Sequence, residues 1–291
     1  MLEYALIAGL LFGLYFSLIG LGLNLVFGVM RIVNLAHGDF LMLGGFAAYL
    51  LFAWRGVNPV ISVFVVFVAF ALIGWPLYYL LVPRLQAAKD PEMLSLILFF
   101  GLSQVIEACA TIRFGTSEYS IPGDVLGSKP WHILNQTFPA SWMISGIASA
   151  VCIGLVYLYL YRTRIGYLTR AVMSQRDEAL STGINVHLVS AFAFGLSLAL
   201  AAVAGVFAPF MFGSILPSMG VAVTITSFTV IVVGSLGQPL GTLLGGMIYG
   251  VALMFMQTYF SSWANLLPYL LLIFILLVRP TGLLGKRVRH A

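Results

Sequence analysis

Hydrophobic residues fill the chain in long uninterrupted runs, and polar residues are gathered between these runs. An apolar run of about 20 residues is long enough to cross a bilayer as a helix, and one soluble core cannot hide several such runs. The pattern therefore predicts an all-α polytopic membrane protein. Candidate spans lie at 4–27, 36–53, 60–82, 93–112, 142–161, 188–212, 221–236, 240–260 and 264–278.

Two of these runs, 221–236 and 264–278, are short for a complete crossing. Such a short apolar segment can be a tilted partner of longer helices or a half-span that lines a cavity. The expected number of transmembrane helices is therefore about eight to ten, some of them discontinuous.

Composition agrees with a membrane protein. Charged residues make up 8% of the 291 residues, roughly a third of the share found in soluble domains. Residues 1–291 are expected to form a single transmembrane domain, with the lipid bilayer as its solvent. The net charge of +5 could suggest nucleic acid or anionic lipid as a partner, but the placement of the basic residues favours a topology signal, and no nucleic acid is expected.

The basic residues orient the predicted spans. Placing Arg31 and the segments 84–89, 162–176 and 279–289 in the cytoplasm gathers there eleven of the 14 Lys and Arg residues. This bias is the one expected of cytoplasmic loops. Nine spans then give an external N-terminus, a cytoplasmic C-terminus, a cytoplasmic loop over 162–187 and an ordered external loop over 113–141.

The sequence lacks the motifs that would make this chain an enzyme. It contains no G-x-x-x-x-G-K-[ST] phosphate loop, no H-E-x-x-H and no G-x-S-x-G. The two cysteines, Cys109 and Cys152, fall in apolar segments without ligand spacing. We expect no catalytic residue, cofactor or metal in this chain.

The cytoplasmic loop contains a predicted short helix. Ser174 followed by Asp177 is a capping-box pattern, and Gly183 can end the helix in a left-handed conformation. Such a short polar helix has no core of its own to bury, so a partner protein is its expected packing surface. The alternative is a solvated loop with helical character.

Four stretches resemble a known family. "AVMSQRDEALSTGIN" at 171–185 resembles the coupling loop of ABC importer permeases. "GLNLVFGVMRIVNLAHGDFLMLGGFAAY" at 22–49 resembles the first block of the LivH-type permeases of branched-chain amino-acid importers, the HAAT family. "FTVIVVGSLGQPLGTLLGGMIYG" at 228–250 and "RPTGLLG" at 279–285 also look like segments of that family.

The resemblance implies the transmembrane-domain fold of ABC importers and a set of partners in a bacterial inner membrane. These are a second permease of the LivM type, two ATPases of the LivG/LivF type that bind ATP and Mg²⁺, and an extracytoplasmic solute-binding protein. ATPase closure would drive alternating access through the coupling helix. The residues expected to couple to the ATPase are Ser174, Arg176, Asp177, Glu178, Ala179, Gly183, Ile184 and Asn185.

Polar residues inside the spans are candidates for the translocation pathway or a hinge, because the bilayer disfavours them. Ser103 and Glu107 fall on one helical face with Gln104 beside it, which is typical of a pore-lining stripe or of a hydrogen-bonded seam between helices. Asn24 and Asn34 could contact substrate or cap the backbone. His37, Gly38 and Asp39 are expected at the cytoplasmic end of the first span, holding a bend that Gly38 permits.

Three functions remain open. The first is a permease subunit for branched-chain or neutral amino acids, or for small polar solutes such as urea, amides or aromatic acids. The second is an ion- or proton-coupled secondary transporter that acts alone and depends on Asp39 or Glu107. The third, an intramembrane enzyme, has no motif to support it.

Overall fold

The computed structural model describes residues 1–285, and their helices confirm the predicted all-α class. A small antiparallel hairpin is added in the loop between the fourth and fifth helices. The elements are α1 Leu2–Met30, α2 His37–Arg55, α3 Pro59–Gln86, α4 Pro91–Phe114, η1 Gly123–Val125, β1 Trp131–Ile133, β2 Gln136–Phe138, α5 Ala140–Arg162, α6 Arg164–Ser174, α7 Arg176–Ser181, α8 Val186–Met211, α9 Met219–Gly234, α10 Pro239–Tyr259, η2 Ser261–Leu266 and α11 Leu267–Val278.

Each of the nine predicted spans is helical in the structure. Seven helical segments in the described part of the chain are long and apolar enough to cross a membrane, counting η2 and α11 as one. The two other predicted spans are α2 and α9, and α9 has only 16 residues. The chain is a multi-pass membrane protein, and α9 is short for a complete crossing, as expected.

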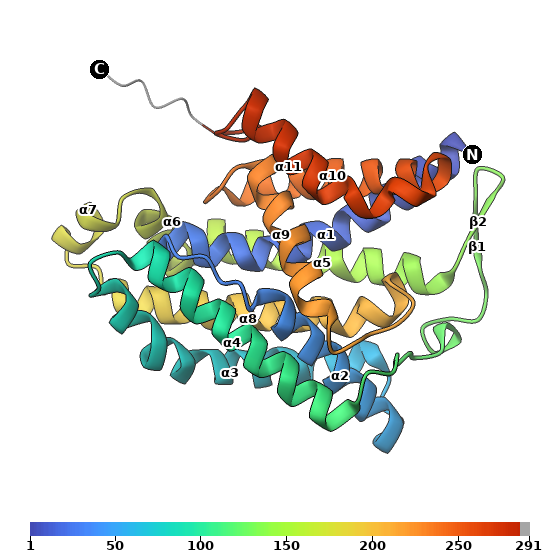
Figure 1. Cartoon of the computed structure of the whole chain (residues 1–291), viewed down its shortest axis with the longest axis horizontal. Coiled ribbons are helices and arrows are strands. Elements are labelled where there is room, and N and C mark those ends of the chain that lie inside the picture. The colour runs from blue at the N-terminus through green and yellow to red at the C-terminus, as the bar shows by residue number, and fades with distance from the viewer. Residues whose placement is uncertain (286–291) are drawn as a thin grey trace.

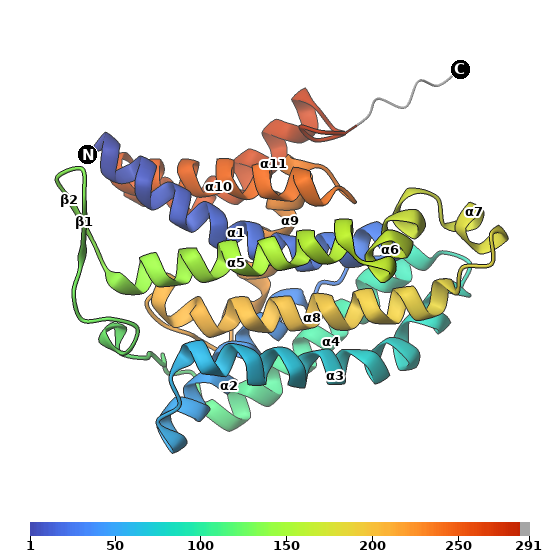
Figure 2. The ribbon, with the colours of Figure 1, turned by 180° about the vertical axis from the view of Figure 1, so that it is seen from behind.

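The long helices lie side by side, with connecting segments at two opposite ends (Figure 1). The short helices α6 and α7 lie at one end, which we call the α7 end, and the β1–β2 hairpin lies at the other, the hairpin end. The view from behind shows the same arrangement (Figure 2). The N-terminus lies at the hairpin end and α11 finishes at the α7 end, so the loops predicted on opposite sides of the membrane are at opposite ends.

Helices α1 and α8 form the centre of the bundle, and most of their residues are buried. Glycine lets their neighbours approach closely. A Cβ on Gly250 of α10 would lie 2.2 Å from the backbone nitrogen of Gly13 in α1. A Cβ on Gly205 of α8 would lie 1.9 Å from the carbonyl oxygen of Leu41 in α2. Small residues at such crossings let membrane helices pack through their backbones.

The chain breaks twice between a long central helix and a shorter one. After α1, Arg31 adopts a left-handed conformation with φ of 57°, and residues 32–36 lead back into the bundle, where α2 begins (Figure 1). After α8, residues 212–218 lead in the same way to α9. Because α1 enters from the hairpin end and α8 from the α7 end, the two breaks approach the interior from opposite sides.

The segment with His37 and Asp39 was predicted at the cytoplasmic end of the first span, and the structure corrects this placement. Asn34, His37 and Asp39 are fully buried. The physical reason is the turn at Arg31, which sends the following residues back among α1, α8 and α9 instead of out of the bundle. Gly38 lies inside α2 and does not make the bend.

The predicted external loop is ordered, as expected. Strands β1 and β2 pair antiparallel with Trp131 opposite Phe138, and Tyr119 bridges to Ile215 beyond α8. Phe138 also stacks on Tyr4 of α1, with ring centroids 5.3 Å apart and nearly parallel planes. These contacts fix the hairpin to the bundle.

Candidate functional site

The loop at 162–187 contains two helices rather than one, and its predicted N-cap is wrong. Ser174 is the last residue of α6 and is itself helical, so its side chain cannot cap the next helix. Gln175 is the residue between α6 and α7, with φ of −148° and ψ of 103°, and its side chain makes no capping hydrogen bond. The sequence pattern marked the position of the break to within one residue but assigned the wrong residue.

The end of α7 follows the prediction. Gly183 has φ of 82°, its N–H donates to the carbonyl of Leu180 at 3.0 Å, and the N–H of Ile184 donates to the carbonyl of Ala179 at 3.2 Å. Glycine adopts this left-handed conformation without steric cost. Asn185 then caps α8, accepting a hydrogen bond from the N–H of Leu188 at 3.0 Å. The Gly183–Asn185 segment therefore joins the two helices through a fixed turn.

The side chains of α7 divide into an outward and an inward set. Asp177, Glu178 and Leu180 are exposed, whereas Ala179 is buried. Arg176 is half-buried and turns inward, where it donates to the side-chain oxygen of Gln86 at 2.8 Å. Burial lowers the pKa of the Arg176 guanidinium, and nearby Tyr78 and Asp177 oppose that shift. The group stays charged at neutral pH, as arginine does in proteins.

A cavity of about 450 Å³ lies beside α7 at the same end of the bundle. Its walls come from the end of α1, the end of α6 and the start of α7, and they include the charged residues Arg31, Arg176 and Asp177. The cavity separates part of α7 from α1, so the short helix is not packed against the bundle along its whole length.

Inside the bundle, the start of α2 meets α9. The N–H of Gly38 donates to the hydroxyl of Thr224 at 2.8 Å, and that hydroxyl donates to the carbonyl of Leu35 at 3.0 Å. A Cβ on Gly38 would lie 2.0 Å from the carbonyl oxygen of Gly220. Gly38 is thus required for close approach of two helices, and Thr224 joins them. Sequence reasoning missed Thr224 because a threonine in an apolar span carries no local signal.

The Asp39 carboxyl lies in this interior with no hydrogen-bond partner among the described residues. It abuts Gly220 of α9, and the side chains of Ser103 and Glu107 of α4 lie near it. Ser103 is buried and Glu107 is half-buried, so this part of the predicted stripe faces α2 of the same chain. Gln104 points the other way and is exposed.

The two asparagines make backbone contacts. Asn24 is fully buried; its side-chain oxygen accepts from the N–H of Gly237 at 2.6 Å, and its amide donates to the carbonyl of Gln238 at 2.9 Å and to Thr242. It therefore fixes the turn between α9 and α10. Asn34 accepts from the N–H of Ala36 at 3.1 Å in the break before α2. His37 contacts the carbonyl of Ile19 at 3.0 Å. Together these contacts support the backbone-capping interpretation.

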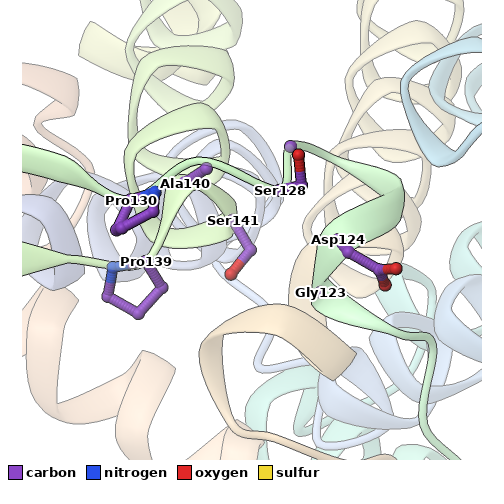
Figure 3. A pocket seen from close by; sticks show the side chains of 8 residues that line it. Gly123, Asp124, Ser128, Pro130, Pro139, Ala140 and Ser141 are labelled. Carbon is purple, nitrogen blue, oxygen red and sulfur yellow. The ribbon is translucent and has the colours of Figure 1, made fainter.

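A second, smaller cavity of about 210 Å³ lies at the hairpin end between the loop and the start of α5 (Figure 3). Ser141 and the prolines Pro130 and Pro139 line it on the α5 side, and Gly123 and Asp124 of η1 line the other side. The Asp124 carboxylate points away from Ser141 (Figure 3). With one carboxylate directed outward, the cavity is a surface recess rather than a cation site.

Comparison with known proteins decides the family of this bundle. A family model described as "Branched-chain amino acid transport system / permease component" matches residues 5–276. The chain belongs to this permease family. Its relatives include the high-affinity branched-chain amino acid permease LivH of Salmonella typhimurium, 28% identical with 96% of this chain and 94% of the relative covered. BraD of Pseudomonas aeruginosa is 29% identical, with 97% and 95% covered.

A probable LivH permease of Methanocaldococcus jannaschii is 28% identical, with 92% of this chain and 88% of the relative covered. No solved structure matches the chain. A permease component is one part of a transport system, so membership of this branched-chain amino acid permease family favours the subunit interpretation over a carrier that acts alone. It also makes transport, rather than catalysis, the function of this permease.

Proposed function

We propose that this chain is the membrane-spanning subunit of an ABC importer that carries branched-chain or related neutral amino acids by alternating access. The family match over residues 5–276 carries the proposal, because it includes both breaks, the coupling loop and all of the bundle except the first residues of α1 and the last two of α11. The relatives named above are permeases for branched-chain amino acids. Urea, short amides and aromatic acids are the other solutes that the test includes.

In this proposal the α7 end faces the cytoplasm and α7 docks on one of two ATPase subunits. Asp177, Glu178 and Leu180 offer two charges and one apolar side chain on an exposed turn. A helix of six residues is not stable by itself in water, so packing against a partner is a physical requirement that docking would meet. The partner chains would supply ATP hydrolysis.

The second permease subunit would meet this chain along α4. Gly101, Gln104 and Ala108 are exposed on this helix, and Glu107 is half-exposed beside them. An exposed amide within an apolar span is costly against lipid, so we expect it to face a partner or a water-filled path. Since Gly101 has no neighbour within 4 Å of a built Cβ, a second helix could approach closely there.

The solute-binding protein would dock at the hairpin end. The loop there exposes Trp131 and Leu134 on a hairpin that Phe138 anchors to α1. An exposed aromatic on a rigid support suits protein recognition. The solute-binding protein at the hairpin end and the ATPase at the α7 end would therefore contact opposite ends of the same helix bundle.

The proposal can be tested by reconstituting this chain with the permease, ATPase and binding-protein chains that it proposes as partners. We expect ATP-dependent uptake of labelled leucine, isoleucine or valine into vesicles when the loaded binding protein is supplied outside.

Urea, acetamide and benzoate would be tried in parallel as alternative solutes. Uptake that persists when the ATPase subunits are omitted would overturn the importer assignment. Uptake of one of the alternative solutes alone, still dependent on ATP, would replace the amino acid while keeping the importer.

A further inference from the structure

Arg176 makes the side-chain hydrogen bonds that join helix α7 to the other helices of the bundle. Within residues 1–285, the other side-chain hydrogen bonds of this segment stay local: Ser181 donates to the carbonyl of Asp177, and Thr182 donates to the carbonyl of Ala179. Ala179 is the buried residue of α7. The hydrogen bonds that lead from α7 side chains to other helices are therefore those of Arg176.

Arg176 reaches three different helices. Its guanidinium donates to the carbonyl of Val29 in the last turn of α1 at 3.3 Å, to the side chain of Gln86 at the end of α3 at 2.8 Å, and more weakly to the hydroxyl of Ser190 in α8 at 3.5 Å. The guanidinium group is planar and holds its N–H donors in a fixed geometry. A displacement of the arginine therefore changes all of its hydrogen bonds at the same time.

The Val29 contact has a separate physical basis. The last carbonyls of a helix have no partner within that helix, and they lie at the negative end of its dipole. The half-buried Arg176 guanidinium donates to one of these carbonyls, which stabilises both the cation and the end of α1. Because α1 and α8 are the central helices of the bundle, Arg176 connects α7 to the part of the protein with the most internal contacts.

The cavity beside α7 takes the place of side-chain packing around this connection. Its volume of about 450 Å³ lies between the end of α1 and the α6–α7 segment, so few packed side chains join the two there. A movement of α7 therefore reaches the central helices through the Arg176 hydrogen bonds, the packing of the single buried residue Ala179 and the chain itself, not through a broad packed surface.

We propose that Arg176 is a positioning residue that transmits the movement of α7 to α1, α3 and α8, rather than a contact of the ATPase. The inference rests on the proposed function, in which α7 receives the movement of the ATPase. It changes the role expected for Arg176 from its sequence position: Asp177 and Glu178 face the partner, and Arg176 faces the bundle.

The test compares uptake with ATP hydrolysis in the reconstituted complex. Arg176→Ala removes the connection, and Gln86→Ala removes its 2.8 Å acceptor from α3 without touching α7. We expect both variants to co-purify with the ATPase subunits and to hydrolyse ATP, while the number of solute molecules carried per ATP falls by about tenfold for Arg176→Ala, the loss equivalent to one charged hydrogen bond. Gln86→Glu keeps a hydrogen-bond acceptor for Arg176, so its ratio of solute molecules to ATP should equal that of the unmodified complex.

Arg84→Ala is the matched control. Arg84 is an exposed arginine of α3, the helix that carries Gln86, and its side chain donates to the carbonyl of Leu80 in that same helix at 2.8 Å. Its uptake per ATP should equal that of the unmodified complex.

An unchanged ratio in Arg176→Ala would overturn the inference. Loss of ATPase co-purification in Arg176→Ala, with a normal ratio in Gln86→Ala, would also overturn it and make Arg176 an ATPase contact. If the unmodified complex shows no ATP-dependent uptake, the proposed function itself fails, and this is seen before any variant is compared.

Discussion

At the scale of single residues, the polar groups of the interior serve mainly to hold the backbone at its breaks. Asn24 accepts from the N–H of Gly237 and donates to the carbonyl of Gln238, which also accepts from the N–H of Thr242, at the turn between α9 and α10. Thr224 does the same for Gly38 and Leu35 at the start of α2. Irregular backbone at membrane depth is tolerated only where such partners are supplied. Asn24 was a candidate for substrate contact, and its side chain is instead occupied by the protein.

Asn24→Ala should therefore destabilise the protein. It leaves the N–H of Gly237 and the carbonyl of Gln238 without their side-chain partner in a half-buried turn, at a cost of about 2 kcal/mol and a fall in Tm of roughly 5 °C. Thermal unfolding of the purified protein in detergent would measure the shift. Gln104→Ala, which truncates an exposed side chain, should leave Tm within about 1 °C. Equal Tm values for the two variants would show that the Asn24 bonds do not stabilise the turn.

At the scale of elements, the coupling segment is an assembly of two short helices joined at Gln175 and closed by the turn at Gly183. The capping-box pattern predicted one helix starting at Ser174, but the preceding residues continue a helix into that serine. The left-handed Gly183 was predictable because only glycine takes this conformation without strain. The direction of Arg176 was not predictable, because its acceptors Gln86 and Val29 come from distant parts of the chain.

The outward face of α7 should carry the contact with the ATPase. Asp177→Ala combined with Glu178→Ala removes both exposed carboxylates, and we expect ATPase binding to weaken by about tenfold or more while insertion into the membrane is unchanged. Co-purification of the ATPase and membrane fractionation would measure the two effects.

Glu92→Ala removes an exposed carboxylate in the first turn of α4 and serves as the control for charge. Unimpaired transport by the double variant would remove the assignment of α7 as the coupling helix.

At the scale of the whole molecule, the helices form a bundle in which α1 and α8 enter from opposite ends and each is followed by a break and a shorter helix. The starts of the two shorter helices meet through Gly38 and Thr224. Around this buried centre, α4 keeps much of its surface free. The exposed polar residues of α4 are thus left for an interface that the single chain does not complete.

Thiol labelling can show whether this face of α4 borders a water-filled path in the assembled transporter. In a background carrying Cys109→Ser and Cys152→Ser, we expect Gln104→Cys in the assembled transporter to react with a membrane-impermeant methanethiosulfonate, at a rate that changes on addition of ATP. Val105→Cys should react at least about tenfold more slowly, because a thiol in lipid does not ionise. Val105 is an equally suitable site for substitution, since it is 59% exposed and points about 100° away on the same helix. Equal rates at the two positions would exclude a water-filled path along this face.

The sequence by itself determined the membrane class, the helical segments, the family and the turn at Gly183. These depend on local properties: the length of apolar runs, which the bilayer fixes, and the conformational freedom of glycine. Tertiary structure decided which polar groups are buried or hydrogen-bonded within the protein. Asn24, Asn34 and His37 bind backbone atoms, Arg176 turns inward, and the segment around Asp39 is buried instead of lying at the membrane surface. Hydrogen-bond partners that lie far apart in the chain meet only when the helices pack, so the side chain of a buried polar residue acquires its role from the fold.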